Sequence, residues 1–397
     1  KVSQTRALRD FHNLYIKQML ISRLSNQDTT LIDYAVGKGG DLPKWINANI
    51  RFAMGIDLSR DNIENRLDGA CARYLNYCKK FRSIPDVLFL HGNTSVNIKS
   101  SDAFSTDKNK QIIKALFGEG TKDESVLGKG VYKNYGLVKE GFNISSIQFA
   151  LHYMFENTET MHNFIKNVSE CTILNGYFIG TCYDGLSIFN MLKSKTKGES
   201  TTLYKNGEKI WEVTKQYNNT EFNNDDSSIG CAIDVYQESI NKVFREYLVN
   251  FTYFIRVMEN YGFVLLSQDE LIEKNLRLST GMFDELYNNL ESELKLHKEK
   301  HNKYGEAINM SDEEKTISFL NRYFIFKKIR NQDSESIKKQ YKLNLSEEEI
   351  DFAEQILNSL EKEDTKGESS KISIKKEKPK NQVTKSLPSK KTTKKTQ

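Results

Sequence analysis

The chain has 397 residues, of which 38% are hydrophobic and 28% are charged, and its formal net charge is +5. This composition suits a protein with a buried core and room for one large or two ordinary domains. No apolar run approaches the roughly 18 residues that a membrane span requires, so we expect no membrane partner.

The net positive charge comes from the C-terminal residues. Residues 366–397 hold 11 Lys and 2 Glu, which leaves a net charge of −4 for residues 1–365. The five Cys residues form no Cys-x-x-Cys pair, a pattern that favours a reducing compartment and argues against a zinc site. No signal peptide is visible, so we expect an intracellular protein. Because the sequence begins at Lys1, we expect it to be a fragment of a longer chain.

Helix-like and strand-like patterns alternate along the first half of the chain. Residues 1–24 predict an amphipathic helix with a basic edge. Short apolar runs that predict strands follow at 31–36, 52–56, 86–91, 143–149 and 173–180. Strands that alternate with helices predict an α/β fold, with a mostly parallel sheet covered by helices on both faces.

Two stretches interrupt this alternation and indicate insertions. Residues 99–140 are rich in Lys, Ser, Asp and Gly and contain a short predicted helix near 109–117. Residues 196–230 form a second excursion, in which the run from Tyr204 to Glu208 is typical of a hairpin.

The C-terminal part is predicted to complete the core and then to lose structure. We expect the core to resume over 231–266 and to end with a strand over 317–328. Residues 345–362 predict an acidic amphipathic helix, whereas 364–397 has too few apolar residues to fold. The Lys runs of this tail indicate either binding of RNA phosphates or a solvated, disordered terminus.

The most informative segment follows the first predicted strand. The apolar run that begins at Leu31 ends in a turn with Gly37, Gly39 and Gly40, and a second apolar run ends at Asp57. This order of strand, glycine turn, helix, strand and acid is typical of nucleotide-cofactor sites. Glycine lets the backbone approach the ligand closely, and the acid can accept both hydroxyls of a ribose.

Details of the turn narrow the choice of cofactor. A dinucleotide site would have a third glycine where Leu42 stands, and a phosphate-binding loop would have Ser or Thr after Lys38, where Gly39 stands. The acid at Asp41 instead fits S-adenosylmethionine, which carries a cationic sulfonium and no pyrophosphate. Asp57 fits the ribose acceptor, and the alternative role is a helix N-cap.

A second group of residues follows the fourth predicted strand. That strand ends at Gln148, and Phe149, His152 and Tyr153 come directly after it. Ligands of open α/β sheets bind beyond the carboxyl ends of the strands, so this cluster faces the same crevice as the glycine turn. Aromatic residues alone favour a packed core, but buried polar Gln148 and His152 need partners. Asn93, after the third strand, either meets an adenine or forms a turn.

The sequence resembles the mRNA cap guanine-N7 methyltransferase family over about residues 1–330. The segments that match motifs of this family, in order, are Phe11–Lys17, Gly37–Trp45, Gly55–Asp57, Ile147–Tyr153, Phe178–Thr181, Glu246–Val249 and Tyr323–Lys327. The insertions look like those of the capping enzymes of large cytoplasmic DNA viruses. The resemblance implies a Rossmann-like, class I S-adenosylmethionine-dependent methyltransferase fold, with a mostly parallel seven-stranded sheet and inserted cap-binding elements.

The resemblance also implies which residues bind the cofactor and the cap. Those implied for S-adenosylmethionine, which becomes S-adenosylhomocysteine, are Asn13, Lys17, Ala35, Gly37, Asp41, Asp57, Asn93 and Gln148. The family usually has Gly in place of Ala35 and Asp in place of Asn93. Those implied for the cap are Lys38, His152, Tyr153, Tyr183 and Glu246.

Individual roles follow from the same resemblance. Lys17 lies near the methionine carboxylate, and Lys38 holds the triphosphate. Glu246 accepts from the N1 and N2 hydrogens of guanine. Tyr183 replaces a proline of the family and stacks on the base. A late aromatic residue that closes over the guanine is not clearly aligned, and the candidates are Phe319 and Tyr323.

The implied activity is methyl transfer to N7 of a GpppN cap by in-line displacement, without a general base. Gln148, His152, Tyr153 and Glu246 would therefore position the reactants. The alternatives are methylation of another nucleic-acid base and an inactive cap-binding subunit. Implied partners are capped RNA, triphosphatase and guanylyltransferase domains upstream on the same chain, and a stimulatory subunit. The location would be a cytoplasmic viral factory or virion for a viral chain, and the nucleus for a cellular one.

Domain boundaries and metal binding complete these expectations. We expect a methyltransferase domain over 1–330, a helical extension over 331–363 and a Lys-rich disordered tail over 364–397. His297 and His301 are four residues apart and resemble a metal-binding pair, but their Lys-Glu-Lys setting favours an exposed helix. We therefore expect no metal.

Overall fold

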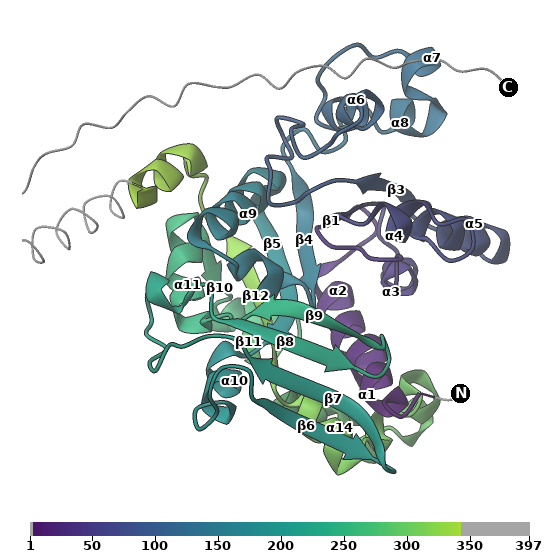
Figure 1. The fold of residues 1–397 in the computed structure, drawn as a ribbon. Helices are drawn as coiled ribbons and strands as arrows, with labels where there is room; N and C mark the ends of the chain where they lie inside the picture. The colour runs from purple at the N-terminus through teal and green to yellow at the C-terminus, as the bar shows by residue number, and fades with distance from the viewer. Residues whose placement is uncertain (1–2, 343–397) are drawn as a thin grey trace, which may run out of the picture. The chain divides into compact units, whose positions relative to one another are not determined.

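A mostly parallel sheet is the centre of the computed structural model, which describes residues 3–342 (Figure 1). One compact unit spans Lys1–Tyr341. The helix predicted at 345–362 and the tail predicted at 364–397 lie outside the described residues.

Five parallel strands form most of this sheet, in the order β3-β2-β1-β4-β5. Their bounds are Thr30–Asp33 for β1, Phe52–Asp57 for β2, Asp86–His91 for β3, Phe142–Gln148 for β4 and Thr172–Tyr183 for β5. All five predicted strands are thus confirmed. Because β1 lies between β2 and β4, successive connections run in opposite directions from it, and such sheets bind ligands beyond the carboxyl end of that strand.

Antiparallel strands complete the sheet next to β5. Strand β12 (Asn321–Lys328) pairs with β5 on one side and with β10 (Phe263–Leu265) on the other, and the short β11 (Thr280–Met282) also pairs with β12. The main path therefore has the seven strands that were expected, and β11 adds an eighth. The expected fold class, a Rossmann-like α/β sheet, is confirmed.

The prediction of a strand over 317–328 was wrong at its start. Residues Asp312–Ser318 form helix α14, in which Ser311 and Glu314 make a reciprocal capping box. This cap satisfies two backbone N–H groups that would otherwise have no partner. Ile317 of the helix is buried in the cluster that also contains Trp211. The strand β12 begins only after this helix, at Asn321.

Helices cover both faces of the sheet because neighbouring strand residues point to opposite sides. On one face Leu31 packs with α3 (Leu42–Asn47) and α13 (Phe283–Leu296), and on the other Ile32 packs with α9 (Thr158–Cys171) and α11 (Phe251–Asn260). Further helices are α4 (Arg60–Glu64), α5 (Ala70–Lys80), α10 (Gly185–Met191) and α12 (Gln268–Glu273).

The N-terminal segment is one continuous helical stretch, as predicted, that begins at Arg6. It consists of α1 (Arg6–Asp10), a π-helical stretch (Phe11–Lys17) and α2 (Gln18–Leu24). π-helical turns are rare and occur frequently at functional sites. This one contains Asn13 and Lys17, two of the residues expected to bind the cofactor.

The segment at 99–140 contains more helix than the one short helix that was predicted. It forms α6 (Asp107–Leu116), α7 (Glu124–Leu127) and α8 (Lys129–Lys133). Ile113, Leu116 and Val138 are buried in the same core cluster as Phe142 of β4. The segment therefore packs onto the main core despite its polar composition.

A second, four-stranded antiparallel sheet follows α10. Its strands are β6 (Ser200–Lys205), β7 (Glu208–Lys215), β8 (Ala232–Gln237) and β9 (Lys242–Tyr247), in that spatial order. The predicted hairpin is confirmed, because Asn206 and Gly207 join β6 to β7 with φ of 53° and 80°, the backbone of a type I′ turn.

The expectation that the main core resumes at 231 was wrong. Strands β8 and β9 pair with the hairpin, and Ile233 and Val235 join a separate cluster with Trp211 and Val213 under α10. Alternating apolar residues indicate one buried face but do not say which core it faces. The chain returns to the main core at Val249, just before α11.

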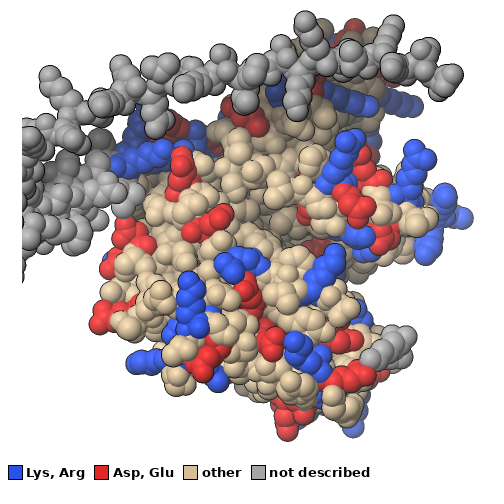
Figure 2. Space-filling model, viewed as in Figure 1, with Lys and Arg blue, Asp and Glu red and all other residues tan. Residues whose placement is uncertain are grey.

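The remaining described elements are short helical segments. Three 3₁₀ segments span Leu151–Phe155, Lys298–Tyr304 and Ala307–Asn309, a short one spans Asp226–Ser228, and residues 334–342 are helical. Within residues 3–342 no helix is long and apolar enough to cross a bilayer. On the face drawn in Figure 2, Lys and Arg are interspersed with Asp and Glu rather than separated by sign.

Gly55 in β2 allows the glycine turn to lie directly against the sheet, which gives a first prediction. A Cβ atom there would lie 2.7 Å from Val36 Cγ2 and 2.9 Å from Phe89 Cδ1. We expect Gly55→Ala to lower the free energy of unfolding by about 1–3 kcal/mol, because it overpacks the core. Urea unfolding followed by circular dichroism measures this loss.

The matched control for this substitution is Gly130→Ala in α8, where a Cβ atom meets nothing within 4 Å. It should raise the free energy of unfolding by about 0.5–1 kcal/mol, because alanine favours helix over glycine. Equal effects of the two substitutions would contradict the proposed overpacking.

Candidate functional site

The glycine turn is held against the end of β2 by Asp57. Gly37 and Gly39 have φ of 54° and 71°, the left-handed region that glycine adopts at little cost. Asp57 Oδ2 accepts a hydrogen bond of 2.7 Å from the Gly37 backbone N–H, and Oδ1 accepts from Ser59 N–H and Asn62 Nδ2. Ser59 itself is the N-cap of α4, so the alternative role of Asp57 as N-cap was wrong.

Three donors do not exhaust the Asp57 carboxylate. An ionised carboxylate offers about four acceptor positions, so Asp57 can still accept from a ligand. Its side chain is nearly buried, at 9% exposure. The residue therefore fixes the turn and keeps one acceptor for a hydroxyl group.

A buried charge cluster ties the N-terminal segment to the same turn. Asp41 Oδ1 lies 3.1 Å from Lys17 Nζ and 3.2 Å from Lys44 Nζ, and all three side chains are largely buried. Burial alone would raise the pKa of Asp41, but the two ammonium groups lower it below its ordinary value. Lys44 Nζ also donates to Asn13 Oδ1 and to the Gly40 carbonyl oxygen.

Asp33, the last residue of β1, is a third acid at this edge, and sequence reasoning missed it. Burial, and then the charge of Asp41, raise the pKa of Asp33 to about 8. Its Oδ1 accepts from the Ala35 backbone N–H at 3.1 Å. The sequence predicted a strand over 31–36, and an acid inside that apolar run was the pattern that could have identified Asp33, because a buried carboxyl needs partners.

A cavity of about 410 Å³, which we call the His152 cavity, lies between this edge and the second sheet. The N-terminal segment contributes His12, Asn13 and Lys17, and the second sheet contributes Trp211 and Glu246. The other expected residues that line it are His152, Tyr153 and Tyr183. Six of the predicted site residues are therefore brought together here.

His152 and Glu246 are the unusual pair in this cavity. Both side chains are buried, and His152 Nε2 lies 3.6 Å from Glu246 Oε2. Both ring nitrogens of His152 and Oε2 of Glu246 lack a hydrogen-bond partner within residues 3–342. Buried polar atoms without partners are costly, and here they are exposed only to a cavity that a ligand can fill.

Burial also sets the protonation of this pair. It raises the pKa of Glu246 to about 8 and lowers the pKa of His152 to about 3. Near neutral pH both groups are therefore predominantly uncharged in the unliganded protein. The 3.6 Å contact is not an ion pair, and each group remains available to a ligand.

Aromatic rings form the walls of the His152 cavity. Phe149 has φ of 54°, which is rare for a bulky residue, and its ring stacks on His12 at 5.0 Å and lies 5.5 Å from Lys17 Nζ. Tyr183 accepts a hydrogen bond of 3.0 Å from Trp211 Nε1. Tyr153 is 40% exposed and lies edge-on to His152.

Sequence reasoning placed Phe149 in the cluster that faces the crevice, but it missed three other residues that line the cavity: His12, Trp211 and Phe244. Phe244 could have been found from Glu246, because residues two apart on a strand share one face. His12 precedes Asn13 in the matched N-terminal motif. Nothing in the pattern around Trp211 distinguishes it from a core residue.

Seven predicted residues lie outside the cavity lining: Ala35, Gly37, Asp41 and Asp57 at the glycine-turn edge, and Lys38, Asn93 and Gln148. Gln148 bonds to Ser146 Oγ and Thr181 Oγ1 between the ends of β4 and β5. Lys38 pairs with Asp68 at 2.7 Å. Asn93 Oδ1 accepts from the Ser95 backbone N–H, which is the arrangement of a turn former.

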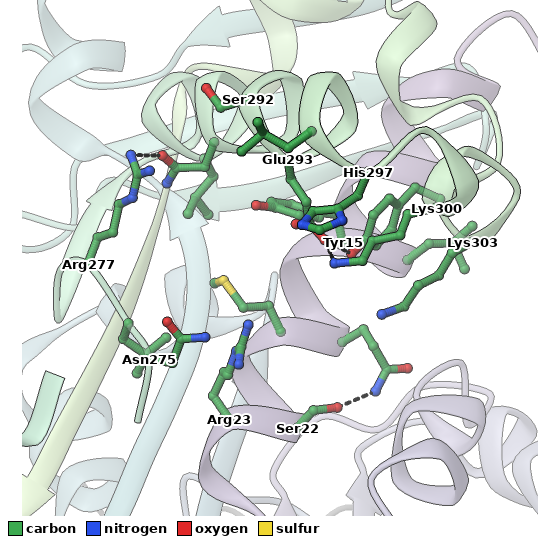
Figure 3. Close-up of a pocket in the computed structure, with 18 of the residues that line it drawn as sticks. Tyr15, Ser22, Arg23, Asn275, Arg277, Ser292, Glu293, His297, Lys300 and Lys303 are labelled. Atoms are coloured by element: carbon green, nitrogen blue, oxygen red, sulfur yellow. Dashed lines mark hydrogen bonds and ion pairs between the residues drawn. The ribbon is translucent and has the colours of Figure 1, made fainter. Parts of the chain in front are cut away.

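The late aromatic candidates also lie elsewhere. The ring of Phe319 packs on Tyr287. Tyr323 lines a larger cavity of about 610 Å³ on another face of the N-terminal segment. Figure 3 shows that Arg23, Arg277, Lys300 and Lys303 surround this second cavity beneath the helix that carries Glu293.

The histidine pair does not share one helix as expected. α13 ends at Leu296, and His297 bonds to Glu299. Within the described residues no group of three or more metal-ligating side chains is present.

Comparisons with known proteins give a consistent picture. Residues 1–329 match the family described as the mRNA (guanine-N(7))-methyltransferase domain. The chain is 29% identical to a probable mRNA-capping enzyme of Acanthamoeba polyphaga mimivirus, over 82% of this chain and 28% of that protein. It is 27% identical to the mRNA cap guanine-N(7) methyltransferase of Saccharomyces cerevisiae, over 66% of this chain and 51% of that protein.

A further curated relative and a solved structure are also similar to this chain. The mRNA cap guanine-N(7) methyltransferase of Schizosaccharomyces pombe is 27% identical over 65% of this chain and 60% of that protein. A putative S-adenosylmethionine-dependent methyltransferase from Listeria monocytogenes covers 81% of this chain and 98% of its own, with 14% identity and a TM-score of 0.40, which is too distant to carry an argument. The chain spans between 28% and 60% of the length of these curated relatives.

The buried carboxyl of Glu246 predicts a pH-dependent stability. Because its pKa is raised to about 8, the folded protein favours the protonated form, and stability falls as pH rises from about 4.5 through 8. At pH 8.5 we expect Glu246→Gln, which cannot ionise, to have a free energy of unfolding higher than that of the parent by on the order of a few kcal/mol. It should therefore unfold at a higher temperature. The gap should close towards pH 5 in thermal scans.

The exposed Glu119→Gln serves as the control, and its unfolding profile should follow that of the parent at every pH. A gap between the parent and Glu246→Gln that stays constant from pH 5 to pH 8.5 would contradict the burial-driven shift.

Proposed function

This chain belongs to the mRNA (guanine-N7)-methyltransferase domain family, and from that premise we propose that it transfers a methyl group from S-adenosylmethionine to N7 of the guanosine cap of RNA. The observation that carries the proposal is the unpartnered pair His152 and Glu246 in a buried cavity. The supporting geometry comes from the second sheet, which brings Glu246 to the carboxyl edge of the parallel strands.

The pair fits the edge of guanine. Guanine presents hydrogens on N1 and N2, so Glu246 Oε2 accepts from them, while a neutral His152 can donate from one ring nitrogen and accept at the other. Adenine has no hydrogen on N1 and would leave the buried carboxyl of Glu246 unpaired. Sites with buried polar groups reject ligands that leave those groups unpaired by large factors.

The cofactor edge fits S-adenosylmethionine. Asp57 keeps an acceptor for the ribose, and the cluster of Asp41 with Lys17 offers charges of both signs to the amino-acid end. The backbone from Ala35 to Gly37 can approach the ligand closely, and Asn93 lies beyond β3 for the adenine. When bound, this cofactor supplies an electrophilic methyl group on a cationic sulfonium.

The residues of this chain position the reaction and move no proton. N7 of guanine has a free lone pair at neutral pH, so no base has to remove a hydrogen from it. Tyr153, His152 and Glu246 instead hold the base so that N7 faces the cofactor edge, and such alignment can lower a barrier by several kcal/mol. Donation from N1 and N2 of the bound guanine favours the ionised form of Glu246, and that carboxylate in turn favours the positive charge that develops on the guanine.

The whole protein's arrangement forms part of the proposal. The proposed catalytic domain is 1–330, followed by an extension over 331–363, which the structure describes only as far as residue 342, and by a Lys-rich segment over 364–397. Because the chain spans only part of its relatives' length, triphosphatase and guanylyltransferase domains are proposed to precede it on the same chain. Capped RNA is its substrate, and a stimulatory subunit is a further proposed partner.

A single assay tests the activity. The protein is incubated with S-adenosylmethionine labelled in its methyl group and with GpppA-capped RNA, and the digested product is examined for N7-methylguanosine. We expect label in the cap alone. Label in uncapped RNA would favour another nucleic-acid base as the target, and no transfer at all would leave only a cap-binding role.

The role of His152 gives a separate prediction. If it recognises guanine and does not act as a base, His152→Ala should raise KM for the cap by roughly 10- to 100-fold, the loss of a buried hydrogen bond, with little change in kcat. Added imidazole should restore nothing. The exposed His301→Ala is the control, and a loss confined to kcat that imidazole rescues would show that His152 transfers a proton.

A further inference from the structure

A third cavity lies against the end of β7 and has no role in the function proposed above. Its volume is about 450 Å³, and it is enclosed by Phe189 of α10, the loop after α10 and the loop after β7. We call it the Lys215 cavity, after the side chain at its base. The polar and charged residues that line it include Lys193, Lys195, Lys197, Lys215 and Tyr217.

Lys215 is a buried cation without a counter-ion. Its side chain is 8% exposed, and Nζ donates to the carbonyl oxygens of Leu192 and Lys195 at 3.4 and 2.9 Å. No carboxylate of residues 3–342 lies within ion-pair distance of it. An ammonium group has three donors, and buried charges are normally paired with an opposite charge. Lys215 therefore retains a donor and an uncompensated charge.

The hydroxyl group of Tyr217 is a second, independent sign of a missing ligand. Tyr217 is 5% exposed, and its hydroxyl oxygen is buried without any hydrogen-bond partner. The ring itself is well held, because it stacks on Phe189 at 5.4 Å and lies 4.8 Å from Lys215 Nζ. Packing thus explains the ring but leaves the hydroxyl group unexplained.

The loop after α10 adds three further charges. Lys193, Lys195 and Lys197 alternate along it, and none of them forms an ion pair in the described part of the chain. The nearby acid is Glu199, which accepts from the Thr196 backbone N–H and whose pKa is lowered chiefly by that hydrogen bond. Four lysines face one carboxylate, so the cavity attracts an anion.

The Lys215 cavity and the His152 cavity share one strand. β7 contributes Trp211 to the first-described cavity and Lys215 to this one. Four residues of a strand span about 13 Å. In the cross-strand register, Lys215 and Glu246 both pair with Ile233 of β8. A chain that leaves the His152 cavity therefore has a second anchoring point on the same sheet.

We propose that the Lys215 cavity binds a phosphate group of the RNA strand whose cap occupies the His152 cavity. Lysines act as point charges that hold phosphates without reading the sequence, and the Tyr217 hydroxyl group donates to a phosphate oxygen. The three lysines of the loop after α10, of which Lys193 and Lys197 are exposed and Lys195 is half-buried, favour an extended polyanion over a single small anion. This inference deepens the proposed function and depends on it only for the position of the cap.

The test compares capped ligands of different length. The variant Lys193→Ala/Lys195→Ala/Lys197→Ala and the variant Tyr217→Phe are compared with the parent in methylation of the dinucleotide GpppA and of a capped 20-nucleotide RNA. The control Lys79→Ala/Lys80→Ala/Arg82→Ala removes three exposed charges from and beyond α5. Binding of the same RNA is also measured by filter retention at several KCl concentrations.

For the triple lysine variant we expect KM for the capped RNA to rise on the order of 10- to 100-fold, and the slope of log affinity against log salt to fall by about 2, as three lost phosphate contacts predict. KM for GpppA should not change. Tyr217→Phe should weaken RNA binding without lowering the unfolding temperature, because its hydroxyl group has no partner in the protein. The α5 control should behave like the parent.

Other outcomes would overturn the inference. Equal losses for GpppA and for the long RNA would show that these lysines serve the cap itself, and a loss equal to that of the control would reduce the effect to general charge. The site would instead bind a free anion if millimolar inorganic phosphate raised the unfolding temperature of the parent while the variants kept the RNA affinity of the parent. If no ligand is methylated, the proposed activity fails, yet filter binding still decides whether the cavity holds RNA.

Discussion

The burial of Asp41 between two lysines is the interaction on which the rest of the site depends. Its carboxylate is compensated by Lys17 from the N-terminal segment and by Lys44 from α3. Removing one partner from a buried ion pair costs about 3–5 kcal/mol, because a charge is left uncompensated. The cluster therefore fixes the N-terminal segment across the carboxyl ends of the strands, and the other side of that segment becomes a wall of the His152 cavity.

The two halves of the site are prepared in different ways. At the glycine turn almost every polar group already has a protein partner, as Asp57 shows with its three donors. In the His152 cavity both ring nitrogens of His152 and Oε2 of Glu246 have no partner among the described residues. Each unsatisfied group costs about 1–3 kcal/mol, a cost that the folded protein bears until a ligand supplies the partners. Ligand binding and stability are therefore coupled mainly through this second half.

Much of the fold could be predicted because its strands are continuous apolar runs followed by glycine or an acid. The sequence predicted all five parallel strands, the N-terminal helix and the hairpin at Asn206. It did not predict that β8 and β9 leave the main core, because a strand with one apolar face can cover either of two cores. The strand predicted at 317 failed because a capping box at Ser311 outweighs the strand propensity of the apolar residues that follow.

The site was predictable where a residue stands at a strand end or in a matched motif, and less so where tertiary packing decides. Asp57, His152 and Glu246 were identified in advance, and the structure places two of them in one cavity. Phe149 was expected in a cluster that faces the crevice but was given no role, and its left-handed backbone, held by Thr181, brings its ring to the cavity lining. The segment that carries the second sheet also begins and ends side by side, where the Gly185 N–H donates to the Val249 carbonyl oxygen. Under the proposed function, exchanging residues 186–248 would therefore change the contacts of Glu246 with the acceptor, while the glycine turn and its charge cluster keep their own partners.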